Sequence, residues 1–156
     1  MKIVRKLCGV IGPLGIIGIF AVNAYPMLMG GKIYQIETGS MEPTIKTGSY
    51  VLVRPVEEPK FGQVVMFDEA GSTVPIIHRV VSVNAGGKTL TTRGDANGAD
   101  DASISRSQIK GMVVDVFNRY GAYHRPYQIG VGLLSLALIG LSLTKSKKKG
   151  RHIKDA

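Results

Sequence analysis

Three short segments in the middle of the chain carry side chains that together suit nucleophilic catalysis. The first holds Ser40 beside a glycine, the second holds His78 within an aliphatic run, and the third is an acidic loop over residues 93–101. A serine hydroxyl is a weak nucleophile until a base removes its proton, and an imidazole with an unperturbed pKa of about 6.5 suits that task. A carboxylate on the other ring nitrogen fixes the tautomer and stabilises the imidazolium. The sequence therefore offers one candidate of each kind.

Each segment also has a simpler structural interpretation. The segment around Ser40 is typical of a turn, and a lone histidine among aliphatic residues is more often structural than catalytic. The acidic loop is typical of a solvated turn or a loose calcium loop, but it lacks the glutamate and the spacing of an EF-hand. The other histidines suit a base less well, because His124 adjoins an apolar run and His152 lies in a basic tail. The combination of the three segments is what favours catalysis.

The region that must position these residues is predicted to be mainly β. Short runs rich in Val, Ile, Thr, Tyr and Phe alternate with Gly, Pro, Asn and Asp, which is typical of a small antiparallel β domain. Gly86 and Gly87 predict a hairpin, and in a strand His78 shares a face with Ile76 and Val80. The predicted strands are 33–37, 50–54, 63–67, 76–83, 89–92 and 112–117.

Two uncharged apolar runs flank this region, and basic residues lie beyond both. About 20 such residues cross a hydrocarbon core of ~30 Å, so we predict transmembrane helices over 7–29 and 127–144. The ends, 1–6 and 145–156, carry nine basic residues and one acid, whereas 30–126 carries 11 basic and 10 acidic residues. Because Lys and Arg favour the cytoplasmic side, we predict a two-pass protein of the cell membrane with both termini cytoplasmic and the β domain extracytoplasmic.

The composition narrows the remaining classes of function. The net charge of +9 comes almost entirely from the two ends of the chain, so a nucleic-acid partner is not expected. The lipid bilayer is expected as a partner, because basic residues flank both apolar runs. The single cysteine, Cys8, excludes an internal disulfide framework and a multi-thiolate metal site. A cleaved secretory signal is the alternative for the first apolar run, with Val22 and Ala24 at −3 and −1 of a possible cut, although Pro26 follows closely.

Five motifs, in this order along the chain, resemble the type I signal peptidase family. They are Gly-Ser-Met-Glu-Pro-Thr, Gly-Ser-Tyr-Val-Leu-Val, Gly-Gln-Val-Val-Met-Phe, His-Arg-Val and Arg-Gly-Asp-Ala-Asn-Gly-Ala-Asp-Asp. The chain resembles the endoplasmic-reticulum-like branch, which also occurs in archaea and some Gram-positive bacteria and has histidine in place of a lysine base. The resemblance runs from about residue 38 to 116. It implies the family's mainly antiparallel β architecture, here flanked by N-terminal and C-terminal transmembrane helices.

The resemblance implies a role for each matching residue. Ser40 matches the nucleophile, His78 the general base and Asp101 the aspartate of the triad. Asp95 is expected to support the site or share the role of the acid, and Asp100 remains an alternative. The oxyanion hole is expected from the backbone N–H of Ser40 and the hydroxyl of Thr38.

The implied reaction is the removal of signal peptides from secretory preproteins through an acyl-enzyme, without a metal or an organic cofactor. The end of the signal is expected to bind as an added strand, with pockets for small residues at −1 and −3. Ser40 follows Met29 by 11 residues, which predicts a site near the outer membrane surface. Met41 either dips into the lipid interface or belongs to the core. Accessory membrane subunits are left open.

Three alternatives remain at this stage. The same residues would serve a dedicated processing peptidase for a few matrix, pilus or spore proteins. A non-catalytic, membrane-anchored β adaptor would keep Ser40 and His78 for structural reasons. A basic protein bound to a membrane surface or to nucleic acid would be removed by a high-salt wash, unlike a protein with two spanning helices.

Overall fold

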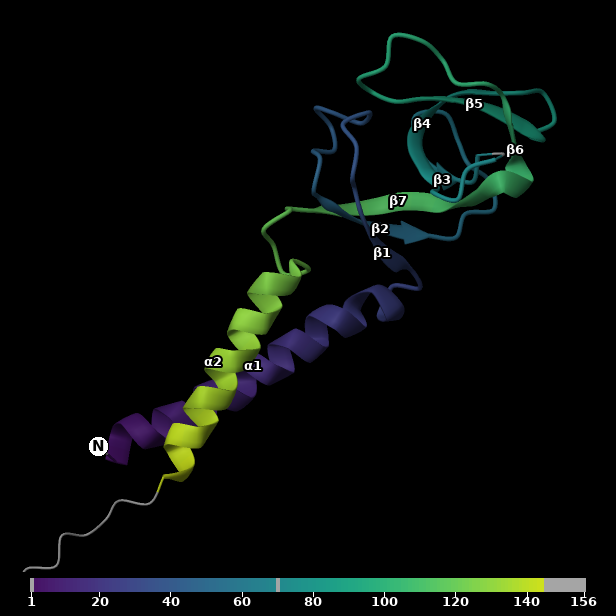
Figure 1. Cartoon of the computed structure of the whole chain (residues 1–156). Helices are drawn as coiled ribbons and strands as arrows, with labels where there is room; N and C mark the ends of the chain where they lie inside the picture. The colour runs from purple at the N-terminus through teal and green to yellow at the C-terminus, as the bar shows by residue number, and fades with distance from the viewer. Residues whose placement is uncertain (1, 70, 145–156) are drawn as a thin grey trace, which may run out of the picture. The chain divides into compact units, whose positions relative to one another are not determined.

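The computed structural model describes residues 2–69 and 71–144, in two compact units (Figure 1). One unit comprises the described residues up to Phe20 and from Gln128 onward, and the other comprises Ala21–Tyr127. The basic tail predicted at 145–156 lies outside the described residues.

Among the described residues, the second unit holds seven strands in one sheet. All of its pairings are antiparallel and the order is β1-β2-β7-β3-β4-β5-β6, so the last strand returns to the middle of the sheet. This confirms the mainly antiparallel β fold. The strands are β1 Lys32–Gln35, β2 Tyr50–Arg54, β3 Val64–Phe67, β4 Ile76–Val83, β5 Thr89–Arg93, β6 Ile104–Ser105 and β7 Ile109–Phe117.

One observed strand was not predicted from the sequence, and another is longer than predicted. β6 has two residues, too few to show an alternating pattern, and the 3-10 helix Arg106–Gln108 follows it directly. β7 begins at Ile109 rather than at 112, because its pairing with β3 overrides the weak strand propensity of Lys110 and Gly111. The predicted hairpin between β4 and β5 is confirmed.

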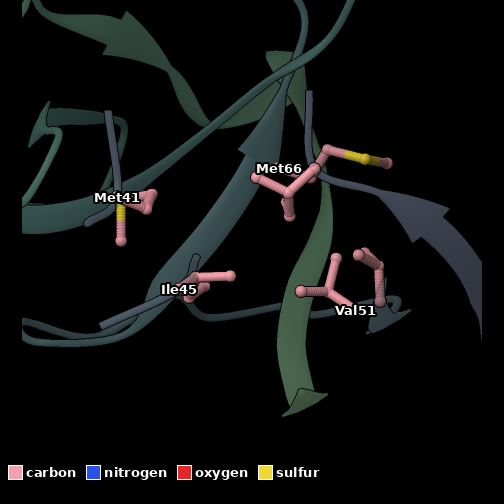
Figure 2. Packing of buried hydrophobic residues seen from close by; sticks show 6 residues of the cluster. Met41, Ile45, Val51 and Met66 are labelled. Carbon is pink, nitrogen blue, oxygen red and sulfur yellow. The ribbon is translucent and has the colours of Figure 1, made fainter. Parts of the chain in front are cut away.

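Two groups of buried side chains form the core, and the first lies beneath the segment that carries Ser40. Met41 is 1% exposed and packs in this group, so it belongs to the core rather than to a lipid interface (Figure 2). The buried members of the first group are Ile36, Met41, Ile45, Val51, Val53 and Met66. Those of the second are Val65, Phe67, Val80, Leu90 and Ile104.

Two helices, α1 Lys2–Leu28 and α2 Arg125–Leu143, are long and apolar enough to cross a membrane by length and composition. α1 begins five residues before the predicted start because Lys and Arg are good helix formers, so the helix extends beyond the apolar run into the basic residues before it. In the first unit a Cβ on Gly12 would lie 2.8 Å from the carbonyl oxygen of Ser135, so glycine permits the two backbones to approach closely.

Candidate active site

The segment that carries Ser40 is held from both sides. The Oε1 atom of Glu42 accepts hydrogen bonds from the backbone N–H and the hydroxyl of Thr47, at 3.1 and 2.8 Å. These bonds hold the pKa of the Glu42 carboxyl below its ordinary value. On the inner side Met41 and Ile45 are buried, and Ile45 donates its N–H to the Met41 carbonyl at 2.8 Å. Ser40 therefore lies on a turn whose neighbours are fixed.

The acidic loop fixes the backbone of Ser40 directly. The N–H of Ala96 donates to the carbonyl oxygen of Ser40 at 2.9 Å, and the N–H of Asn97 closes a turn onto the Gly94 carbonyl at 2.9 Å. A Cβ on Gly94 would lie 2.6 Å from the same Ser40 oxygen. Only glycine permits this approach, so the first and third motifs depend on each other through backbone contacts.

His78 lies on β4 with its ring largely buried, at 7% exposure, edge-on to Phe67. Its Nδ1 atom lies 2.6 Å from Oδ2 of Asp101. That same Oδ2 accepts the hydroxyl of Thr92 at 2.7 Å, and the Asp101 N–H donates to the Thr92 carbonyl at 2.8 Å. Because a carboxylate only accepts, the proton is assigned to Nδ1, which leaves the lone pair of Nε2 as the basic site of the ring.

The other two candidate aspartates bind arginines. Arg79, directly after the histidine, donates from Nε and Nη2 to the two carboxylate oxygens of Asp95, at 2.8 and 2.7 Å, and from Nη1 to the carbonyl of Gly62 at 2.8 Å. The hydrogen bond to Arg79 lowers the pKa of Asp95 and, in return, raises that of the guanidinium. Asp100 lies 3.2 Å from Nη1 of Arg93 at an exposed site. In the structure, Asp101 contacts the ring of His78, whereas Asp100 contacts Arg93.

Ser40 and His78 line one cavity of about 690 Å³, together with Thr38 and Asn97. The hydroxyl oxygens of Thr38 and Ser40 lie 3.4 Å apart. In the described part of the chain no hydrogen bond joins the side chains of Ser40 and His78. Bonds of this kind are often long before substrate binds. The cavity is therefore lined by the residues that carry two hydroxyls and an imidazole, Ser40, Thr38 and His78. The carboxylate of Asp101 contacts the ring of His78.

Arg79 and Thr92 were not predicted from the sequence to belong to the site. The position of Arg79 next to the candidate base was a usable signal, because alternation in a strand sends it to the opposite face. Thr92 carried no such signal: its contact with Asp101 depends on the pairing of β4 with β5, in which Val80 lies opposite Thr92. Across residues 2–69 and 71–144, no group of three or more His, Cys, Asp and Glu side chains is placed to hold a metal ion.

The family model described as "Signal peptidase, peptidase S26" matches residues 10–110. The chain is also similar to fungal proteins named "Signal peptidase complex catalytic subunit sec11". It is 37% identical to that of Sclerotinia sclerotiorum over 95 residues, which cover 53% of this chain and 55% of the relative. It is 37% identical to that of Metarhizium robertsii over 98 residues, which cover 54% and 57%. The chain spans about half the length of the curated relatives it matches.

Proposed function

Because the chain belongs to the signal peptidase family, peptidase S26, we propose that it is a membrane-bound serine endopeptidase that removes N-terminal signal peptides from secreted preproteins. The observation that carries this proposal is the 2.6 Å contact between His78 and Asp101, behind a cavity that Ser40 also lines. A histidine with a purely structural role has no need to line a cavity that a serine also lines.

In the proposed reaction the Ser40 hydroxyl oxygen attacks the carbonyl carbon of the residue at −1, and Nε2 of His78 takes the hydroxyl proton. Asp101 stabilises the imidazolium that forms. When the tetrahedral intermediate collapses, His78 gives the proton to the departing amine, and the acyl group stays on Ser40. A water molecule, deprotonated by the same ring, then hydrolyses the ester and restores the serine.

The negative oxygen of the intermediate needs hydrogen-bond donors on the side of the nucleophile. The backbone N–H of Ser40 is one proposed donor, and the Thr38 hydroxyl is the second because it lies 3.4 Å from the Ser40 hydroxyl. Loss of one such donor costs about 10²–10³-fold in kcat in a serine protease.

The membrane arrangement is a further part of the proposal. The two apolar helices support a membrane protein, and the charge distribution supports cytoplasmic ends with residues 30–126 on the other side of the cell membrane. In a Cys8→Ser background, a membrane-impermeant thiol reagent added outside intact cells should label Lys60→Cys and leave Lys149→Cys unlabelled. The reverse pattern contradicts the proposed orientation.

The relatives' names describe catalytic subunits of a signal peptidase complex. We extend this to the chain and propose that it binds accessory membrane subunits. Affinity purification of the full chain from native membranes should yield them in fixed proportion. Recovery of the chain alone, with full activity on preproteins, opposes this extension.

The decisive experiment is cleavage of a model preprotein by the full chain in detergent, with the cut position mapped by mass spectrometry. We expect cleavage after a small residue at −1, and its loss in Ser40→Ala, while insertion into the membrane persists. Ser82→Ala is the matched control, because this exposed serine lies on β4 outside the cavity. A serine-reactive acylating probe should label the wild type and not Ser40→Ala. Absence of labelling and cleavage in the wild type favours the adaptor.

A further inference from the structure

A second cavity, of about 730 Å³, adjoins the one that holds Ser40 and His78. The two cavities share three lining residues: Tyr34, Met66 and Pro75. The second cavity is lined at its far end by Met27 in the last turn of α1 and by Gly31 just before β1. The two cavities therefore form one groove, which runs from the end of α1 to the candidate nucleophile.

One wall of this groove is suited to an extended peptide. β1 lies at the edge of the sheet and pairs with β2 alone, so one side of its backbone is unpaired within the described residues. Lys32 and Tyr34 line the far cavity, and the chain from Tyr34 to Thr38 lines the cavity of the site. A free strand edge beside a groove is where an added strand gains main-chain hydrogen bonds.

We propose that the far cavity is a subsite for the signal peptide segment roughly five to seven residues upstream of the cut, so that recognition extends past −1 and −3. This inference rests on the proposed function. An added strand has the same rise per residue as the edge strand it pairs with, about 3.3 Å, so each peptide residue lies beside one residue of the edge. With −1 beside Thr38, the residue at −3 lies beside Ile36, −5 lies beside Tyr34 and −7 lies beside Lys32.

The direction of the peptide follows from the two ends of the groove. One end holds Ser40, where the bond is cut, and the other holds Met27, near the end of an apolar helix long enough to span a membrane. A signal peptide whose apolar part is still in the membrane enters from the second end. Its upstream residues therefore occupy the far cavity.

The charged groups that line the far cavity determine which upstream residues it favours. Two ammonium groups, those of Lys32 and Lys110, line it together with one carboxylate, that of Asp68, whose Oδ2 lies 2.6 Å from Nζ of Lys110. The lining also includes apolar side chains such as Val53 and Met66. The net positive charge favours an acidic or uncharged residue at −7, which lies beside Lys32 on the face of the cavity, and disfavours lysine there, through interactions that salt screens.

The test uses the full chain in detergent and three preproteins that differ only at −7, which is Gln, Glu or Lys. At low salt we expect kcat/KM for the Glu substrate to exceed that for the Lys substrate by roughly 3–10-fold, and the ratio to approach one in high salt. The double substitution Lys32→Glu with Lys110→Glu should invert the ratio. Since the ratio is measured within one preparation, partial unfolding of a variant does not alter it.

The matched control is Lys88→Glu, which reverses an exposed lysine outside both cavities and should keep the wild-type ratio. In addition, a wild-type substrate that begins at −4 should lose several-fold in kcat/KM. Equal cleavage of all three preproteins, or the same ratio in the double variant as in the wild type, overturns the subsite alone. A wild type that cleaves none of the preproteins overturns the proposed function, and the subsite with it.

Discussion

The acidic loop contains two carboxylates that bind neighbouring residues of β4 and differ in what they are placed to do. Asp101 contacts His78, which lines the cavity. The same carboxylate oxygen also accepts a hydrogen bond from the buried hydroxyl of Thr92. Asp95 forms a two-point ion pair with Arg79 and belongs to the turn whose Ala96 N–H holds the Ser40 carbonyl. One end of the loop thus contacts the proposed base, and the other fixes the backbone of the candidate nucleophile.

Identical residues in one motif therefore need not have the same role. The Asp101 end is expected to affect mainly the chemical step, because its carboxylate contacts the His78 ring as well as the Thr92 hydroxyl. The Asp95 end is expected to affect stability and the placement of Ser40 together, because it joins a strand to a turn. Variants at the two ends of the loop should therefore differ in what they change.

The largest effect on kcat is expected from a substitution of His78, the proposed proton acceptor. His78→Lys should reduce kcat by about 10³-fold or more, because a lysine in a pocket built for a ring does not place its amine where Nε2 lies. The measurement is single-turnover cleavage of a model preprotein. Turnover close to that of the wild type contradicts the need for a positioned imidazole.

Asp101→Asn should reduce kcat by about 10²–10⁴-fold, since an amide neither holds the required tautomer nor stabilises the imidazolium. Asp100→Asn is the matched control and should stay within about twofold, because its ion pair with Arg93 is exposed. Steady-state kinetics on both variants compare adjacent carboxylates. If Asp100→Asn proves the more damaging, the orienting role moves to Asp100.

Gly94→Ala should reduce kcat/KM by about tenfold or more, because the added Cβ would lie 2.6 Å from the Ser40 carbonyl oxygen and must displace the turn. Gly98→Ala is the control within the same loop, since no atom lies within 4 Å of its Cβ. Cleavage assays and labelling by the acylating probe report the position of the nucleophile. Equal activity of the two variants shows that the contact with the turn does not position Ser40.

Asp95→Asn should lower the free energy of unfolding by about 1–3 kcal/mol at pH 7, because a charged hydrogen-bonded pair is lost. The pKa of Asp95 in the folded chain is below its ordinary value of 3.8, so the pair stabilises the fold above that pH. The contribution disappears as the pH falls through the lower folded-state pKa. Thermal unfolding from pH 7 to pH 3 should therefore show the Tm gap between wild type and variant narrowing only below about pH 4. A gap that does not depend on pH contradicts this account.

Much of the fold follows from the sequence alone because its signals are local. The two long uncharged runs predict both helices, and alternation between turn residues predicts six of the strands, with ends that shift by a few residues. The hairpin at Gly86 and Gly87 is likewise encoded where it forms, since both glycines adopt positive φ angles of 98° and 66°. Local backbone preference and apolar spacing are properties of consecutive residues, so they can be read without knowing the fold.

Packing between distant segments determines which aspartate contacts His78 and which contacts Arg79. Asp101 is 23 residues from His78 and Asp95 is 16 residues from Arg79, and three aspartates within seven residues look alike in sequence. The pairing of β4 with β5 includes a register shift between Val80 and Ser82, and it is this register that sets the contacts of the acidic loop. Burial of Met41 and the groove that continues past the site also depend on packing between distant segments. Such contacts are fixed by the free energy of the whole sheet, and no run of neighbouring residues specifies them.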